Sequence, residues 1–321
     1  MSPIETTKPN LINKDANLSF VVELSEQIST IAFSNSELSQ DLILIAFPRE
    51  ISVAQLDSQE PYELKELIKF NHGVQCTALS LSPITTIYGV PKILVFCAAG
   101  NDFKLRIFES DISQKDTTKV INAHSDYIND VAFDPDNNYL VSASDDNTAK
   151  LWSTEDYHCL YTFKLKSPGI SCCWHKDDNS KLMLAEKMGV IRFYNVNTQK
   201  PILSVDYNKP IAAAHWAPSD PQIVGCLQHG ELVIWDLTRA SRPLYTKLLF
   251  ADSGNSIKFS PFGELVATMS QLEGTLKVTN VQSQHQRLSA QISLASNISW
   301  HFRLPFVCVG VDNNLMFWKV T

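Results

Sequence analysis

The chain has 321 residues, of which 44% are hydrophobic and 19% are charged, and its formal net charge is −7 at pH 7. This balance argues against direct binding to nucleic-acid phosphates, which requires clustered basic side chains. Lys104, Arg106 and Arg192 instead alternate with apolar residues, so we expect them on a solvated strand face. No run approaches the roughly 18 apolar residues of a membrane span, and no signal peptide is recognisable. We therefore expect an intracellular protein with no membrane insertion.

A strand signature recurs along almost the whole chain. Residues 1–17 are polar and are expected to form a flexible tail, and residues 18–321 are expected to form one domain. Within that domain, apolar alternation that ends in an aromatic or large apolar residue predicts seven first strands, which end at Phe33, Leu81, Phe133, Trp174, Trp216, Phe259 and Trp300. The spacings lie near the roughly 40–45 residues per repeat of a propeller blade. The sequence therefore predicts seven blades.

A second signature marks a later strand in each blade. It ends at Ala54, Phe108, Trp152, Tyr194, Trp235, Thr279 and Trp318. Only three residues follow Trp318, so the last blade lacks an outer strand of its own. The apolar segment Leu18–Leu24 is predicted to supply that strand by pairing beside Leu315–Val320, which removes the open edge of the ring.

The segment from Ala123 to Trp152 contains one whole repeat, AHSDYINDVAFDPDNNYLVSASDDNTAKLW. It resembles the WD-repeat family, and the resemblance implies an all-β, seven-bladed WD-repeat β-propeller closed by an N-terminal strand. It also implies a buried polar network of a loop His, a strand Ser, a turn Asp and a closing Trp, which correspond to His124, Ser142, Asp146 and Trp152. We interpret these four residues as structural, because a buried His paired with Asp satisfies polar groups that are costly to bury alone.

Other blades depart from this pattern. The turn Asp is replaced by Met188 in the fourth blade and by Gly in the fifth. These blades are therefore expected to rely on apolar packing.

No residue pattern indicates catalysis, a cofactor or a metal. The seven cysteines include no C-x-x-C pair, and adjacent Cys172 and Cys173 would point to opposite faces of a strand. The chain has no phosphate-binding glycine loop, no H-E-x-x-H motif and no nucleophile elbow. The inner strands are expected to carry small or apolar residues, which include Ala32, Ala132, Ala212 and Ala213. We therefore predict a protein that is not an enzyme and holds neither cofactor nor metal.

Four segments carry a more specific resemblance: residues 101–111, 167–196, 215–243 and 297–318. They are similar to the nucleoporin 37 family, small WD-repeat subunits of the Y-shaped, outer-ring scaffold complex of the nuclear pore. The resemblance implies a non-catalytic scaffold subunit that supports pore assembly and nucleocytoplasmic transport. It also implies a monomer within a hetero-oligomer, bound chiefly to the large nucleoporin 160. The implied location is the nuclear envelope and, in animals, the kinetochore during mitosis.

Two other classes of WD-repeat adaptor stay open. A substrate receptor of a cullin ubiquitin ligase would carry Trp-Asp-x-Arg after a closing strand, whereas Trp235-Asp236-Leu237-Thr238-Arg239 places the Arg one position late. A histone-peptide reader would use an acidic or aromatic mouth of the ring, where Asp145 and Asp146 are expected.

The turns between the first and second strands predict a partner surface. They are polar at residues 134–138, 175–180 and 217–222, but in four consecutive blades they carry apolar residues at positions expected to be exposed: Leu38, Ile87, Tyr88, Phe262 and Phe302. A contiguous apolar arc indicates an interface, so we predict that it binds a helical scaffold partner. The alternative is that each side chain folds back onto its own blade.

Overall fold

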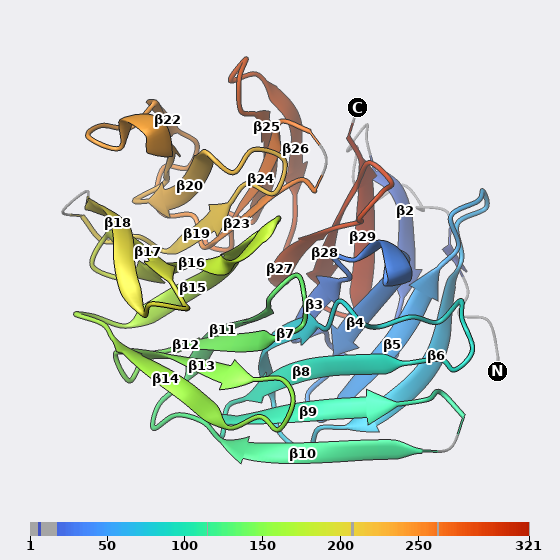
Figure 1. Cartoon of the computed structure of the whole chain (residues 1–321). Coiled ribbons are helices and arrows are strands. Elements are labelled where there is room, and N and C mark those ends of the chain that lie inside the picture. Colours follow the sequence, from blue (N-terminus) through green and yellow to red (C-terminus); the bar gives the residue numbers. More distant parts are fainter. Residues whose placement is uncertain (1–5, 8–17, 114, 207–208, 262, 321) are drawn as a thin grey trace.

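Seven small antiparallel sheets are arranged around a central axis (Figure 1). The computed structural model describes residues 6–7, 18–113, 115–206, 209–261 and 263–320. Six sheets are four-stranded meanders in chain order, and the seventh joins segments from both ends of the sequence. The fold is the seven-bladed β-propeller that the repeat spacing predicts.

The seven residues predicted to end the first strands all lie on the innermost strands of the blades. From blade one to blade seven these strands are β3 (Thr30–Phe33), β7 (Cys76–Leu81), β11 (Ile128–Phe133), β15 (Gly169–His175), β19 (Ala213–Trp216), β23 (Ser256–Phe259) and β27 (Ala295–Trp300). The second strands lie between two sheet neighbours and are the most completely buried: β4 (Leu42–Ala46), β8 (Leu94–Gly100), β12 (Tyr139–Ser144), β16 (Asp178–Glu186), β20 (Ile223–Gln228), β24 (Leu265–Ser270) and β28 (Phe306–Val311).

The second sequence signature lies on the third strands, as predicted. These are β5 (Glu50–Leu56), β9 (Lys104–Ser110), β13 (Thr148–Ser153), β17 (Val190–Asn195), β21 (Glu231–Asp236), β25 (Thr275–Asn280) and β29 (Asn314–Lys319). The outer strands are β6 (Leu64–Asn71), β10 (Asp116–Asn122), β14 (Cys159–Lys164), β18 (Lys200–Asp206), β22 (Tyr245–Leu248), β26 (Gln286–Gln291) and β2 (Leu18–Glu23). Two short 3-10 helices, η1 (Glu37–Ser39) and η2 (Leu237–Arg239), complete the described elements together with β1 (Thr6–Thr7).

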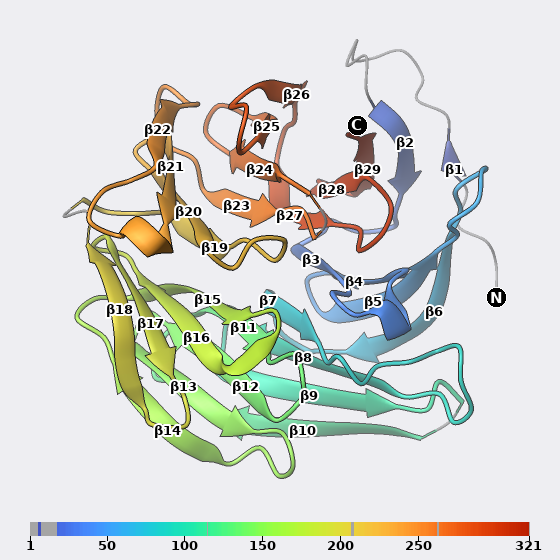
Figure 2. The ribbon, with the colours of Figure 1, turned by 45° about the horizontal axis from the view of Figure 1, so that its top comes forward.

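The predicted closure of the ring is confirmed in blade seven. Strand β2 pairs antiparallel with β29, with Leu18 opposite Trp318 and Phe20 opposite Phe317. Strand β1 pairs with the outer side of β2, where it is visible in Figure 2. The rest of the expected tail, residues 1–5 and 8–17, lies outside the described residues.

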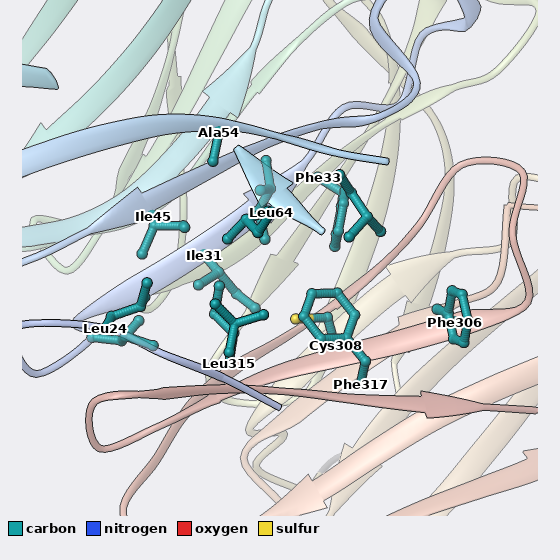
Figure 3. Packing of buried hydrophobic residues seen from close by; sticks show 14 of the residues in the cluster. Leu24, Ile31, Phe33, Ile45, Ala54, Leu64, Phe306, Cys308, Leu315 and Phe317 are labelled. Atoms are coloured by element: carbon teal, nitrogen blue, oxygen red, sulfur yellow. The ribbon is translucent and has the colours of Figure 1, made fainter. Parts of the chain in front are cut away.

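The apolar core is divided among the seven junctions between neighbouring blades, each of which holds one cluster of buried side chains. Figure 3 shows the cluster between blades seven and one, where Leu24, Ile31 and Phe317 from distant parts of the sequence lie together. The Phe20 ring stacks on Phe317 with 4.3 Å between ring centroids. Burial of one such large side chain contributes about 1.5–3 kcal/mol. Closure thus seals an apolar junction as well as a strand edge.

The meander topology separates the connections onto two faces. Turns between first and second strands and between third and fourth strands share one face, called the bottom face below. The other turns form the top face. A channel of about 620 Å³ runs between the seven first strands.

Candidate partner-binding surface

The four residues of the expected polar network in blade three lie together. Trp152 Nε1 donates a hydrogen bond to Ser142 Oγ at 3.0 Å, and Ser142 Oγ lies 2.8 Å from His124 Nε2. On the other side of the ring, His124 Nδ1 lies 2.8 Å from Asp146 Oδ2. Because Ser142 accepts from Trp152, its own proton points to His124 Nε2, and His124 Nδ1–H donates to Asp146. Protons are thus ordered along a single chain of hydrogen bonds.

This network has the electrostatics of a structural element. Burial lowers the pKa of His124, although Asp146 partly opposes the change, so the imidazole is neutral. For Asp146, burial alone would raise the pKa, but hydrogen bonds from Thr148 and His124 outweigh it and lower the pKa. The His124 side chain is fully buried, and both of its ring nitrogens have partners. The Ser142 hydroxyl therefore serves as a packed link between Trp152 and His124.

Blade four solves the same problem with different residues. The backbone N–H groups of Lys166 and Ser167, in the loop before the blade, donate to Glu186 Oε2 at 2.7 and 3.1 Å. Arg192 on β17 donates to the other carboxylate oxygen, Oε1 of Glu186. The Glu186 side chain is only 1% exposed. A carboxylate at the end of β16 thus replaces the turn carboxylate that Met188 lacks.

Two further blades contain related contacts. In blade six, Glu273 Oε1 accepts from the backbone N–H groups of Ala251 and Asp252. In blade two, Arg106 Nη2 lies 2.7 Å from Asp102 Oδ2 at the tip of the turn. In blades two, four and six, polar contacts therefore add to the apolar packing that was expected to act alone.

The expected solvated strand face is wrong for two of its three residues. The side chains of Arg106 and Arg192 are mostly buried in their ion pairs, because the third strand of each blade carries them beneath the loop. A buried guanidinium with a bidentate or multiply bonded carboxylate is an architectural contact. These arginines are consequently not part of a phosphate-binding surface.

Polar side chains on the first strands join neighbouring blades. A first strand has one unpaired edge, and the side chain of the preceding blade accepts hydrogen bonds from its backbone N–H groups. The pairs, acceptor first, are Ser80–Phe133, Asp130–Cys172, Ser171–Ala214, His215–Phe259, Asn297–Ile31 and Ser299–Phe33, at 2.8–3.2 Å. The expectation of small or apolar inner strands is thus incomplete: Ala32, Ala132 and Ala213 line the channel, but acceptors alternate with them.

Two titratable side chains in the channel, Asp130 and His215, take part in these hydrogen bonds between blades. Burial raises the pKa of Asp130, although Lys258 and the hydrogen bond from Cys172 oppose the change. Burial also lowers the pKa of His215 well below its usual value, and nearby Lys258 adds to this effect. In both cases burial disfavours the charged form of the side chain.

The cysteine cluster considered as a metal site is buried. Burial raises the pKa of Cys172 well above its ordinary value and that of Cys173 to about 11, so neither is a ready thiolate ligand. Across the described ranges, no group of three or more His, Cys, Asp or Glu side chains is placed to hold a metal ion. A search of the same ranges finds no helix with the length and apolarity to cross a membrane.

The predicted apolar arc of the bottom face is only partly exposed. Leu38 and Tyr88 have 55% and 57% of their surface exposed, whereas Ile87 and Phe302 retain 9% and 7%. The expectation of exposure is therefore wrong for Ile87, which packs into the core between blades one and two, and for Phe302, which lines the bottom of the channel. Phe262 lies outside the described residues.

Five exposed apolar residues lie on the bottom-face connections of blades one and two. Three of them were not predicted, because the long connection between β7 and β8 has no strand periodicity. Together with Leu38 and Tyr88 they form what we call the blade-one–two patch: Leu38, Ile84, Tyr88, Val90 and Ile93. Val90 is 99% exposed. In Figure 2, η1 lies beside the connection that carries the other four residues.

Hydrogen bonds between the two blades fix this patch. Ser36 Oγ, which also caps η1, donates to the carbonyl of Pro83 at 3.2 Å. Tyr88 OH donates to Asp41 Oδ2 at 2.5 Å and accepts from Gln55 Nε2 at 3.3 Å. Partial burial, followed by the neighbouring Asp41 carboxylate, raises the pKa of Tyr88 to about 12, so the hydroxyl keeps its proton. Tyr88 thus presents its ring to solvent from a fixed position.

Asp41 also lies close to a histidine of blade seven. The Nε2 atom of His301 lies 3.3 Å from Asp41 Oδ1, and His301 Nδ1 accepts from the backbone N–H groups of Arg303 and Leu304. Burial lowers the pKa of His301 although Asp41 opposes this change, and the lowered pKa keeps the ring neutral. The hydrogen bonds that fix Tyr88, a residue of blade two, therefore come from blade one, and blade seven packs a neutral histidine beside Asp41.

Comparison with known proteins agrees with this geometry. A family model described as "WD domain, G-beta repeat" matches residues 115–153, which include the first three strands of blade three. A model described as "Eukaryotic translation initiation factor eIF2A" matches residues 178–321, less than half of the chain.

Full-length relatives are more specific. The chain is 33% identical to "Nucleoporin Nup37" of Mus musculus over 316 residues, which cover 94% of this chain and 97% of that protein. It is 31% identical to the Homo sapiens protein of the same name over 94% of the chain and 97% of that protein. The Drosophila melanogaster protein of that name is also 31% identical, over 93% of this chain and 96% of its own length. With this identity across all seven blades, the chain belongs to the nucleoporin Nup37 family.

Proposed function

We propose that this propeller is a non-catalytic scaffold subunit of the outer ring of the nuclear pore complex, where it supports pore assembly and nucleocytoplasmic transport. The observation that carries the proposal is the similarity to proteins titled nucleoporin over 94% of the chain. Its principal partner is the large nucleoporin 160 of the Y-shaped complex, and its location is the nuclear envelope. In dividing animal cells the same complex takes it to kinetochores.

The use of polar residues in the structure supports a platform over an enzyme. Ser142, His124 and Asp146 are hydrogen-bonded to one another in the blade-three network. Asp130 and His215 accept hydrogen bonds from the first strand of the next blade. Asp236 of the Trp-Asp segment caps η2 by accepting from the N–H of Thr238 at 2.9 Å. These groups hold the ring together, which is what a rigid binding module requires.

The blade-one–two patch is the surface on which we place nucleoporin 160. Isolated exposed apolar side chains are common, but a clustered set with a fixed aromatic is typical of an interface core. Leu38 and Tyr88 are its central anchors, and buried Ile87 packs into the core between blades one and two.

Recovery of native partners tests the function. The tagged full-length chain is purified from its own cells, and the bound proteins are identified by mass spectrometry. Co-purification of nucleoporin 160 with the other outer-ring nucleoporins, together with fluorescence at the nuclear rim, is the expected result. Recovery of a cullin-ligase adaptor or of histones in their place would overturn the proposal.

Paired variants test the surface. Leu38→Ser/Tyr88→Ser should weaken binding to purified nucleoporin 160 by about 10-fold or more, since aromatic anchors commonly dominate interface energies. The control, Leu272→Ser, changes an apolar residue of the top face that is 76% exposed. If the double variant keeps its melting temperature and binds nucleoporin 160 fully, the interface must lie on another surface.

A further inference from the structure

We propose that the partner segment seated on the blade-one–two patch is basic as well as apolar, with Lys or Arg side chains that flank its apolar contacts. The inference rests on the proposed function for the identity of the partner, but its chemistry comes from the charges around the patch.

The apolar centre of the patch is pre-formed. Tyr88 is fixed by Asp41, and η1 is joined to the neighbouring connection through Ser36 and Pro83. A partner therefore does not have to order these side chains on binding, which reduces the entropic cost of association. Val90 extends the same surface outward.

The connections around this centre are predominantly acidic. Within the described residues, the bottom-face connections of blades seven, one and two carry six acidic and three basic side chains. The acidic residues are Glu37, Asp41, Asp57, Glu60, Glu63 and Asp111, and the basic residues are Lys92, Lys115 and Arg303. One of the three basic residues, Arg303, already contacts Glu37 at 3.4 Å. Asp41 is buried and accepts from Tyr88, so four acidic and two basic side chains remain in these connections, and their net charge is still negative.

The most acidic connection, residues 57–63, is tied to the patch. The N–H of Leu56 donates to the carbonyl of Asp41 at 2.9 Å, and the N–H of Asp57 donates to the carbonyl of Glu63 at 2.8 Å. The Tyr62 ring stacks on Phe20 at 5.3 Å between centroids. Glu60 and Glu63 are exposed on either side of this anchored ring. Two exposed acidic side chains therefore lie on an ordered loop that is joined to the patch through the Leu56–Asp41 hydrogen bond.

Acidic side chains at the edge of an interface act mainly on orientation and association rate. A partner segment with basic residues beside its apolar residues would be attracted and oriented by Glu60 and Glu63 while Leu38, Tyr88 and Val90 form the dry contact. A segment with acidic flanks would be repelled. The charge pattern thus selects among apolar segments.

Matched charge reversals test this rule. The first variant is Glu60→Lys/Glu63→Lys, and the control is Glu155→Lys/Glu264→Lys, which makes the same two substitutions at exposed bottom-face positions of blades three and six. We expect the first variant to lower the association rate constant with purified nucleoporin 160 about 10-fold at low salt. The loss should shrink as the salt concentration rises. The control should stay within about 2-fold of the unaltered protein.

A second pair separates charge from location. Val90→Asp should weaken binding at every salt concentration, whereas Leu272→Asp on the top face should not. If Val90→Asp abolishes binding while Glu60→Lys/Glu63→Lys behaves like its control, the basic-partner inference is overturned and the proposed function stands.

Two designed amphipathic peptides give a readout that does not need nucleoporin 160. They carry the same apolar residues, and one has lysines and the other glutamates on its polar side. Binding of the lysine peptide alone, and its loss in Val90→Asp, supports the inference even if nucleoporin 160 fails to bind. Equal binding of both peptides, binding of neither, or a dimer of the unaltered chain that Val90→Asp dissociates in sedimentation overturns it.

Discussion

Blades three and four place different side chains under equivalent loops. In blade three, Asp146 lies in the turn and is joined through neutral His124 and Ser142 to Trp152. In blade four, the carboxylate of Glu186 comes from the strand before the turn and pairs with Arg192. Both carboxylates accept from backbone N–H groups of the preceding loop. In both blades, a buried carboxylate thus accepts from those N–H groups, and a second side chain donates a hydrogen bond to the same carboxylate.

The two solutions differ in how they should fail. The blade-three network consists mostly of neutral groups. Removal of one polar group leaves its partner without a hydrogen bond and lowers the free energy of unfolding by the penalty for that unsatisfied group. The blade-four pair is ionic and almost fully buried, so removal of one partner leaves the other as a buried charge with no counter-charge. Substitutions in each blade can separate these cases.

The largest effect is expected from Trp152→Ala. It removes a ring that is 4% exposed together with the donor to Ser142, and should lower the free energy of unfolding by about 3–5 kcal/mol. Urea denaturation followed by tryptophan fluorescence and circular dichroism measures the change. A variant as stable as the unaltered protein would contradict the packing described for blade three.

In blade four, Glu186→Gln should cost about 1.5–3 kcal/mol, because an amide keeps an acceptor but cannot neutralise Arg192. The control is Glu155→Gln, an exposed residue of blade three, which should change stability by less than about 0.5 kcal/mol. Equal unfolding midpoints for the two variants would show that the buried ion pair makes no net contribution.

His124→Ala should cost about 1–3 kcal/mol, because Ser142 and Asp146 each lose a partner. Since this effect is structural, the variant should bind partners normally wherever it remains folded. Loss of binding by a fully stable His124→Ala protein would instead indicate a functional site at this position.

The smallest effect concerns pH. The pKa of His124 is lower in the folded chain than in the unfolded chain, so the unfolded state takes up the proton first as the pH falls. The stabilising contribution is present above about pH 6.5 and decreases below it. The stability difference between the unaltered protein and His124→Asn should therefore narrow from pH 7 to pH 5. His158→Asn, at an exposed histidine, is the control; an unchanged difference would contradict a neutral His124.

The strands could be predicted because their burial follows a period of two residues. All seven first strands carry a buried or partly buried aromatic or apolar residue at or next to their last position, such as Phe133 or Trp216, so chain positions alone located the blades. The blade-three network was recognisable for a related reason: its residues keep the spacing of a complete repeat.

The missed residues have no such spacing. Glu186 lies two positions before Met188, the residue that aligns with Asp146 in the repeat. Alignment of the repeats at that one position therefore pointed only to Met188. The signal for Glu186 was an acidic residue at the end of a buried strand with an arginine six residues later. Exposure in the turns could be predicted only in part: Leu38 and Tyr88 are exposed as expected, but Ile87, the neighbour of Tyr88, is buried. Only the contact across blades one and two decides which of them faces solvent.

Ring closure by β2 also sets an order of events during synthesis. The backbone N–H of Lys319 bonds to Ser19, 300 residues earlier in the chain. At roughly 5–20 residues per second, translation leaves β2 without its partner strand for on the order of 15–60 s. During that interval the apolar side chains of Phe20 and Val22 have no blade to enter, so the nascent chain offers a chaperone an early binding site that disappears when the last strand arrives.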